Sequence, residues 1–230
     1  HVILADCEDA FPVPPWLEAP ISYVGPLCRD FDFTWVDRQE LRDSLGLPRE
    51  QTLVLATAGG GSLPDVEFFR SCCYALSHLY PDVHGIMVGG SLARTFGFFH
   101  YDLAGNVRVT DFLPDLPRWL AASDLVLTRG GHSSLWELAL LGVPSLCIPH
   151  SRVDDPFGER YACLMERRGT THVLPERVLN SPTGLADVVR RMLADEGAKA
   201  RMSEAGLRWR DRTGTREAAR IVLEVAGLPS

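Results

Sequence analysis

The stretch from Thr128 to Ser134, TRGGHSS, combines residue types that suit the binding of an anion. It lies where an apolar run, DLVLT, passes into a helical pattern. The first turn of a helix leaves its backbone N–H groups unpaired and carries a partial positive charge, so phosphates bind there. Glycine lets the backbone approach such a ligand closely. We therefore predict a phosphate-binding loop that consists of Gly130, Gly131, His132, Ser133 and Ser134.

Glu137 follows this loop on a polar stripe that runs back to Ser133 and Ser134, at i−4 and i−3. Its Cα would lie roughly 5 Å along the helix axis, about where a nucleoside diphosphate on the N–H groups would place its ribose. A carboxylate there would accept hydrogen bonds from two ribose hydroxyls. The same letters also fit a capping box, S-x-x-E, in which Glu137 would accept the N–H of Ser134 and never meet a ligand. Spacing alone does not decide between these two interpretations.

A second glycine run, Gly59 to Gly61, follows another apolar run, QTLVLATA. Either loop alone is compatible with a tight turn that binds nothing. Two such loops at the carboxyl ends of strands in one sheet favour phosphate binding, with Gly60 and Gly61 as further candidates. Neither loop matches G-x-x-x-x-G-K-[ST] or G-x-G-x-x-G, which disfavours a P-loop nucleotide hydrolase and a dinucleotide-binding domain.

Several other polar residues near these loops have two interpretations each. Arg129 would pair with a phosphate or point into a neighbouring loop. His150 would face the same edge of the sheet or be an ordinary loop histidine, and His132 is expected to offer its backbone N–H rather than its imidazole. Asp154 and Asp155 would bind a sugar or lie in solvent. Two carboxylates are too few for a typical oxygen-ligated metal site, so no metal is predicted.

Strands and helices must alternate to bring these loops together. Apolar runs such as QTLVLATA, VHGIMVGG, DLVLT and PSLCIP are continuous, and helical patterns separate them. Continuous apolar strands that alternate with helices are typical of a parallel sheet covered on both faces. The predicted fold is therefore α/β, a Rossmann-like doubly wound parallel sheet with helices on both faces, whose ligands bind at the carboxyl ends of the strands.

The beginning of the chain has a different character. Residues 1–28 contain two short apolar runs and a proline-rich stretch but no helical pattern, so we expect the tail of a preceding domain plus a linker. Residues 29–230 form the second predicted unit. The chain begins at His1 without an initiator methionine, which suggests a fragment or a processed form of something longer.

The composition excludes several classes of protein. With 46% hydrophobic and 23% charged residues in 230, the chain is an ordinary globular one. Its net charge of −7 argues against a nucleic-acid partner. No apolar run approaches the roughly 20 residues that span a bilayer, and no signal peptide is visible. The six cysteines have neither zinc nor C-x-x-C spacing, so we expect free thiols and a cytoplasmic location.

Longer segments resemble a known family. TRGGHSSLWELALLGVPSLCIPHSRVDDPFGERYACLMERRG resembles the donor-binding signature of glycosyltransferases with the GT-B fold, above all the lipid II-forming N-acetylglucosaminyltransferases and related UDP-glycosyltransferases. YVGPL is similar to the end of that family's N-terminal domain, and LVLATAGGGS to the first strand and loop of its C-terminal domain. The resemblance covers nearly the whole chain. It implies that residues 1–28 end an acceptor domain and that residues 29–230 are the donor-binding half.

The resemblance also implies roles for single residues. Glu137 matches the family's ribose-binding glutamate, and Phe112 and Leu113 match the segment that holds the base. Asp154 and Asp155 fall near the pair that binds the sugar, but the lipid II enzymes have two glutamines where this chain has Phe157 and Gly158, so the donor sugar is not implied. The diphosphate loops are matched by Gly130, Gly131, His132, Ser133, Ser134, Gly60 and Gly61.

The implied activity is metal-independent transfer of a sugar from a nucleoside diphosphate, with UDP expected, to an acceptor that the sequence does not identify. The nucleotide sugar is a substrate, and no cofactor is expected. The catalytic base would lie in the missing N-terminal domain, which would also make any contact with a membrane surface. The chain alone should therefore bind its donor weakly and not turn over. The alternatives are a nucleotide-sugar hydrolase or 2-epimerase, or a non-catalytic donor-binding subunit that needs a partner chain.

Overall fold

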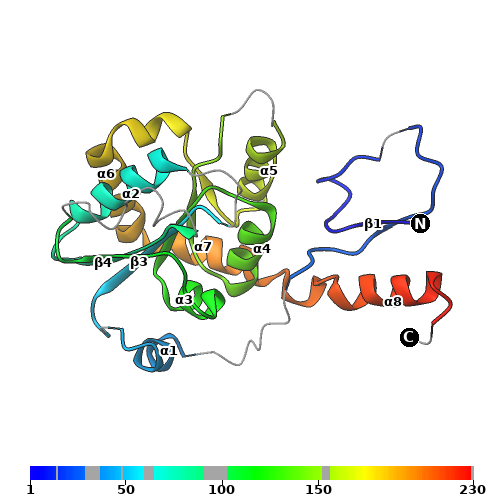
Figure 1. The fold of residues 1–230 in the computed structure, drawn as a ribbon, viewed down its shortest axis with the longest axis horizontal. Coiled ribbons are helices and arrows are strands. Elements are labelled where there is room, and N and C mark those ends of the chain that lie inside the picture. Colours follow the sequence, from blue (N-terminus) through cyan, green and yellow to red (C-terminus); the bar gives the residue numbers. More distant parts are fainter. Residues whose placement is uncertain are drawn as a thin grey trace.

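The computed structural model describes residues 1–13, 15–28, 37–47, 49–59, 65–90, 103–151 and 156–228, without the side chain of Pro156. Its body is a six-stranded sheet between two layers of helices (Figure 1). The strands are β3 (Thr52–Thr57), β4 (Val83–Val88), β5 (Val107–Thr110), β6 (Leu125–Thr128), β7 (Ser145–Cys147) and β8 (His172–Val173). Every pair of neighbours in this sheet is parallel.

The order of the strands explains why the sheet has a natural binding edge. Across the sheet they run β5-β4-β3-β6-β7-β8, so the chain builds outward from β3 in one direction and then returns to build in the other. The adjacent central strands β3 and β6 therefore send their following loops to opposite faces. Sheets of this kind bind ligands at the carboxyl ends of the strands beside such a reversal. The predicted fold class is confirmed.

Helices cover both faces of the sheet because alternate strand residues point to opposite sides. On β3, Val54 packs with α2 (Val66–Ser77) and α6 (Pro182–Ala194). Its neighbour Leu55 packs with α1 (Arg38–Ser44) and α3 (Leu116–Ala122) on the other face. A third cluster joins α4 (His132–Leu141) to α5 (Pro156–Arg167), with Trp136 fully buried at its centre. The continuous apolar runs thus reflect strands that are buried on both faces.

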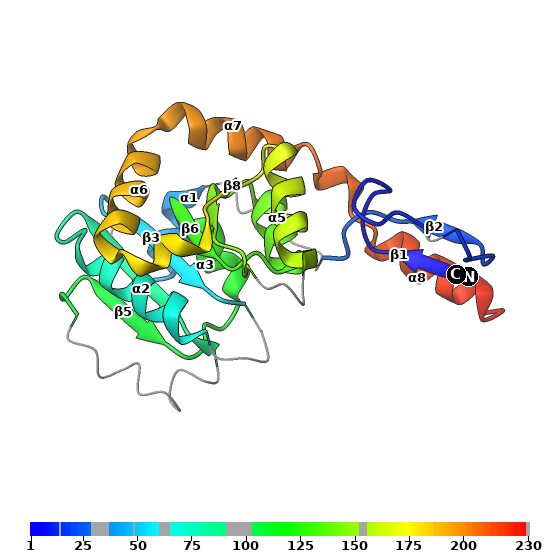
Figure 2. The same cartoon turned by 90° about the horizontal axis from the view of Figure 1, so that it is seen from above.

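The first and last parts of the chain lie together, away from the sheet (Figure 2). The strands β1 (Val2–Leu4) and β2 (Ile21–Tyr23) pair in parallel, and α7 (Glu196–Leu207) leads to α8 (Thr215–Val225) on the same side. The N–H of Gly214 donates to the carbonyl of Pro26 at 2.9 Å, and the Thr215 hydroxyl donates to the carbonyl of Cys28. We call residues 1–28 the tail. The predicted unit boundary at residue 28 falls beside a segment outside the described residues.

The short helix η3 (Glu176–Asn180) was not predicted. It is a single 3₁₀ segment after Pro175, too short to show an apolar periodicity. η3 places Glu176 at the carboxyl edge of the sheet. Because η3 was not predicted, the contact between Glu176 and Arg129 was not predicted either.

Candidate nucleotide-binding site

The two glycine loops begin side by side with the same local structure. Thr57 ends β3 and lies opposite Thr128, which ends β6. Each threonine hydroxyl accepts the N–H of the glycine two residues later, Gly59 or Gly130, at 3.2 Å. Both glycines have positive φ, 75° and 81°, where a side chain would be strained. The loops therefore leave adjacent strands in matching turns at the point where the strand order reverses.

Gly130 has a second reason to lack a side chain. A Cβ at this position would collide with the sulfur of Cys147 on the neighbouring strand β7. The loop must therefore pass close to the end of β7 before it enters α4. This close passage fixes where the first turn of α4 begins.

Among the described residues, no side chain caps the N–H groups at the amino end of α4. Gly131 is the residue before the helix, and the first N–H to bond back along the helix is that of Leu135, to the Gly131 carbonyl at 3.0 Å. The N–H groups of His132, Ser133 and Ser134 precede that bond. They form the positive end that the sequence predicted for a phosphate.

This helix start removes the capping-box interpretation of Glu137. A capping box needs the serine of S-x-x-E in the position before the helix. That position belongs to Gly131, and Ser134 lies inside the first turn. The pattern was misleading because the chain enters the helix three residues before the serine. Glu137 is instead half-buried in the second turn, on the side of the glycine loops.

A cavity of about 270 Å³ lies between the loop after β3, the segments after β4 and β5, α3 and the amino half of α4. Gly59, Ser134 and Glu137 line it, and a Cβ built on Gly59 would lie 3.5 Å from the hydroxyl of Ser134. Phe112 lines it from the segment after β5 and is 71% exposed. The cavity thus combines a carboxylate, a hydroxyl and an exposed aromatic ring within one small space.

Leu113 does not contribute its side chain to this cavity. It is 3% exposed and packs into the core cluster beneath α3. Phe112 and Leu113 are neighbours in an extended segment, so their side chains point to opposite sides. This explains why one lines the cavity and the other packs in the core. Only the backbone of Leu113 is left for contact with a base.

The Arg129 side chain is engaged by protein groups. The side chain is 5% exposed, and its guanidinium donates to the carbonyl of Ile148 at 2.8 Å and to Glu176 at 2.5 Å and pairs with Asp65. His150 lies against the same guanidinium and 3.3 Å from Asp65. We call Arg129, Asp65, His150 and Glu176 the Arg129 cluster. The structure favours the neighbouring-loop interpretation of Arg129 over the phosphate contact, because its donors already face two carboxylates and a carbonyl.

The charges within the Arg129 cluster support one another. Burial by itself would raise the pKa of Glu176, but hydrogen bonds from Arg129 and from the N–H of Ser151 lower it below its ordinary value. The charge of Arg129 acts in the same direction. The carboxylate of Glu176 is therefore ionised, and the cluster joins the start of the TRGGHSS loop to α2 and η3.

His132 was expected to act through its backbone, and its imidazole has a partner of its own. Nε2 lies 3.0 Å from the carboxylate of Asp6, a residue of the tail. Nothing in the local sequence pattern indicated this contact, since the two residues are 126 positions apart. One local feature did exist: an acidic residue directly follows the apolar run HVILA, and carboxylates are buried only when they are paired.

Four predicted residues lie outside the described residues: Gly60, Gly61, Asp154 and Asp155. The next described side chain after the acidic pair, Phe157, stacks on Phe11 of the tail at 5.5 Å and on Tyr161 at 5.4 Å. Among the described residues, no group of three or more His, Cys, Asp and Glu side chains is arranged to hold a metal ion. In the same part of the chain, no helix is long and apolar enough to cross a membrane.

Comparison with known families and proteins gives consistent matches. Residues 86–218 match the family described as "Glycosyltransferase family 28 C-terminal domain". The UDP-N-acetylglucosamine--N-acetylmuramyl-(pentapeptide) pyrophosphoryl-undecaprenol N-acetylglucosamine transferase of Symbiobacterium thermophilum is 30% identical over 197 residues, which cover 82% of this chain and 50% of that protein. Its namesake from Sorangium cellulosum is 34% identical over 127 residues, 55% of this chain and 31% of that protein.

Solved structures share the fold at lower identity. The calicheamicin glycosyltransferase CalG4 superposes with a TM-score of 0.68 at 21% identity, over 98% of this chain and 52% of that one. MurG of Acinetobacter baumannii gives a TM-score of 0.61 at 17% identity, over 92% of this chain and 58% of that one. The chain spans about half the length of these proteins or less.

Proposed function

Because this chain belongs to glycosyltransferase family 28 and forms its C-terminal domain with the GT-B fold, we propose that it is the donor-binding half of a sugar transferase. The donor is a nucleoside-diphosphate sugar, with uracil as the base. The acceptor and the catalytic base belong to an N-terminal half or a partner chain. Matched relatives carry UDP-N-acetylglucosamine transferase names, which supports uridine.

One observation carries the proposal: the cavity that Glu137, Ser134 and Phe112 share at the reversal of the strand order. The exposed ring of Phe112 offers a surface for the base. The carboxylate of Glu137 accepts from the ribose hydroxyls, and the first-turn N–H groups of α4 face the diphosphate. These three contacts follow one another in the order in which base, ribose and diphosphate are linked.

The same arrangement suits the chemistry of transfer. As the bond between the sugar and the diphosphate breaks, negative charge grows on the departing diphosphate. N–H donors and a helix dipole that are fixed before the reaction stabilise that charge without having to reorganise. Among the described residues, this task falls to the backbone of His132, Ser133 and Ser134. The sugar would extend towards Asp154 and Asp155, which remain candidates for its hydroxyls.

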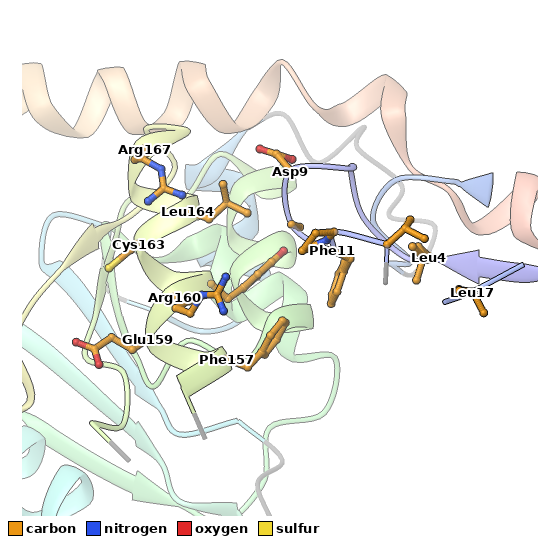
Figure 3. A pocket seen from close by; sticks show the side chains of 14 residues that line it. Leu4, Asp9, Phe11, Leu17, Phe157, Glu159, Arg160, Cys163, Leu164 and Arg167 are labelled. Carbon is orange, nitrogen blue, oxygen red and sulfur yellow. The ribbon is translucent and has the colours of Figure 1, made fainter. Parts of the chain in front are cut away.

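A larger cavity, about 700 Å³, lies between the tail and α5 (Figure 3). Phe11, Leu17 and Leu164 are among the side chains that line it, and none of the residues predicted to bind the donor does so. We assign the donor to the smaller cavity because it lies at the carboxyl ends of β3 and β4 and is bordered by the first two turns of α4. Size alone does not select a phosphate site.

Hydrolysis and 2-epimerisation are not favoured, since the matched relatives are named as transferases.

A cytoplasmic location is part of the proposal and is supported by the thiols, because all six cysteines are free. Burial raises the pKa of Cys28 to about 12, and the nearby charge of Glu137 adds to this shift. The proposal needs no metal, and its expected independence of magnesium is open to measurement.

Calorimetric titration with UDP, GDP and dTDP tests the donor site. We expect UDP to bind most tightly, and Glu137→Ala to weaken UDP binding about 10-fold, the loss expected when a hydrogen-bonding carboxylate is removed. The control is Glu196→Ala, which removes an exposed carboxylate from the first turn of α7 and should leave the affinity unchanged. Equal affinity of Glu137→Ala and the unaltered chain for UDP, or the absence of binding of all three nucleotides, would refute the site.

A further inference from the structure

The Asp6 carboxylate is the most completely enclosed charge among the described residues. It has no exposed surface although it belongs to the tail. Its Oδ2 lies 3.0 Å from Nε2 of His132, accepts Nε1 of Trp136 at 2.9 Å, and accepts the hydroxyl of Tyr161. Its Oδ1 lies 3.1 Å from Nη1 of Arg168. The tail thus inserts one carboxylate among donors from α4, α5 and the turn after α5.

These donors keep the carboxylate ionised. Burial by itself would raise the pKa of Asp6, but hydrogen bonds from His132, Tyr161 and Trp136 and from the N–H of Cys7 lower it well below its ordinary value. A buried charge with so many matched donors has a fixed position, since any displacement would leave donors unpaired. We call Asp6, His132, Trp136, Tyr161 and Arg168 the Asp6 cluster.

Aromatic contacts hold the same region from two sides. Phe11 of the tail lies 6.0 Å from the ring of His132, whose ring is also 4.8 Å from that of Tyr161. Arg168 lies over the rings of Trp136 and Trp209 at 5.2 and 5.1 Å. Figure 3 shows Phe11 of the tail and Phe157 of α5 facing each other. The ring of His132 is therefore fixed by its hydrogen bond and by its neighbours.

His132 connects this cluster to the nucleotide site. It is the first residue of α4, and its N–H is one of the three that the proposed diphosphate faces. Its ring is bound to the tail, while the loop before it is bound to the body through the Arg129 cluster. The amino end of α4 is thus held from both sides, and only one of the two attachments leads out of the domain.

We propose that Asp6 is a positioning residue that fixes the amino end of α4 through His132 and thereby links the diphosphate site to the tail. The inference rests on the proposed function, because it assigns a role in donor binding. Occupation of the diphosphate site and correct seating of the tail then favour each other, as linked equilibria require. The tail leads to the half in which we place the acceptor, so donor binding and the arrangement of the two halves are coupled.

UDP titrations of single and double variants test this link. Asp6→Asn and His132→Ala should each weaken UDP binding by about 5-fold or more, a typical strength for coupling between sites. The double variant should bind UDP no more weakly than the single variant with the lower affinity, because both substitutions remove the same link. His132→Gln, which keeps an N–H donor for Asp6, should recover most of the affinity that His132→Ala loses.

Tyr161→Phe is the matched control, since it removes a different donor to Asp6 and leaves His132 in place. It should lower the denaturation midpoint without changing the affinity for UDP. If Asp6→Asn does not fold, His132→Ala carries the test, because the imidazole is partly exposed. Unchanged UDP affinity in His132→Ala, or equal losses in Tyr161→Phe and Asp6→Asn, overturns the link while the effect of Glu137→Ala still supports the donor site. Absence of UDP binding by the unaltered chain overturns both.

Discussion

Two buried ionic clusters flank the start of α4. They differ in the sign of the central charge and in the parts of the chain that they join. The Arg129 cluster surrounds a cation with the carboxylates of Asp65 and Glu176. The Asp6 cluster surrounds an anion with donors from His132, Trp136, Tyr161 and Arg168. The first joins elements around the six-stranded sheet, whereas the second joins helices of that body to the tail. The TRGGHSS loop therefore contacts α2 and η3 through Arg129 and the tail through His132.

The difference shows how a charged residue beside a phosphate loop should be interpreted. Arg129 has the charge of a phosphate ligand, but a guanidinium that already has several acceptors is a brace for the loop. The positive end of α4 is left to its backbone N–H groups. A charge that supports a site need not touch the ligand, and the distinction depends on which donors are already engaged.

The largest effect should come from removal of the central anion. Asp6→Ala leaves several buried donors without their acceptor and Arg168 with only its exposed partner Asp9, so we expect a loss of about 4 kcal/mol in the free energy of unfolding. Urea denaturation followed by tryptophan fluorescence measures it. A loss no larger than that of a typical surface substitution would contradict the description of this cluster as closed and fully paired.

Removal of the central cation should cost somewhat less. Arg129→Met keeps much of the side-chain volume but leaves Asp65 without its ion pair, while Glu176 is partly exposed and can be hydrated. We expect a loss of about 3 kcal/mol by the same measurement. Arg220→Gln, which removes exposed pairs on α8, is the control and should produce no measurable change. If the Arg129 variant is as stable as the control, Arg129 does not stabilise the loop before α4.

The dependence of stability on pH, compared between the unaltered chain and Asp6→Asn, should isolate the contribution of Asp6 and is a smaller effect. The pKa of Asp6 is lowered from its ordinary value of 3.8, so its ionised form contributes stability above that value and the contribution is lost as the pH falls below it. The difference in unfolding free energy between the unaltered chain and Asp6→Asn should be largest near about pH 7 and shrink towards about pH 3. A difference that stays constant over this range would mean that Asp6 is not an ionised acceptor.

The sequence predicted the fold correctly and indicated a candidate site, for a physical reason. Strands buried on both faces must be continuous apolar runs, and glycines after them must mark turns, so both features are local. The loop from Gly130 to Ser134 and the nearby Glu137 were located in this way. The family resemblance added the role of Phe112, which lies on the same cavity.

What the sequence could not predict are partners that are distant along the chain. His132 and Asp6 are 126 residues apart, and Arg129 and Glu176 are 47 apart. No periodicity connects such positions, because they meet only after the sheet and the tail have formed. Even the local S-x-x-E pattern misled, since the helix begins at His132, with Gly131 rather than Ser134 in the position before it.

Donor binding at Glu137 is the central claim, and it is tested most directly by altering both the residue and the ligand. UDP and 2′,3′-dideoxy-UDP should each be titrated into the unaltered chain and into Glu137→Ala. If Glu137 holds the ribose, the substitution weakens UDP binding about 10-fold but leaves the dideoxy analogue unaffected, because the hydroxyls that it would bind are already gone. Equal losses for the two nucleotides, or no loss for either, would contradict the placement of the ribose at Glu137.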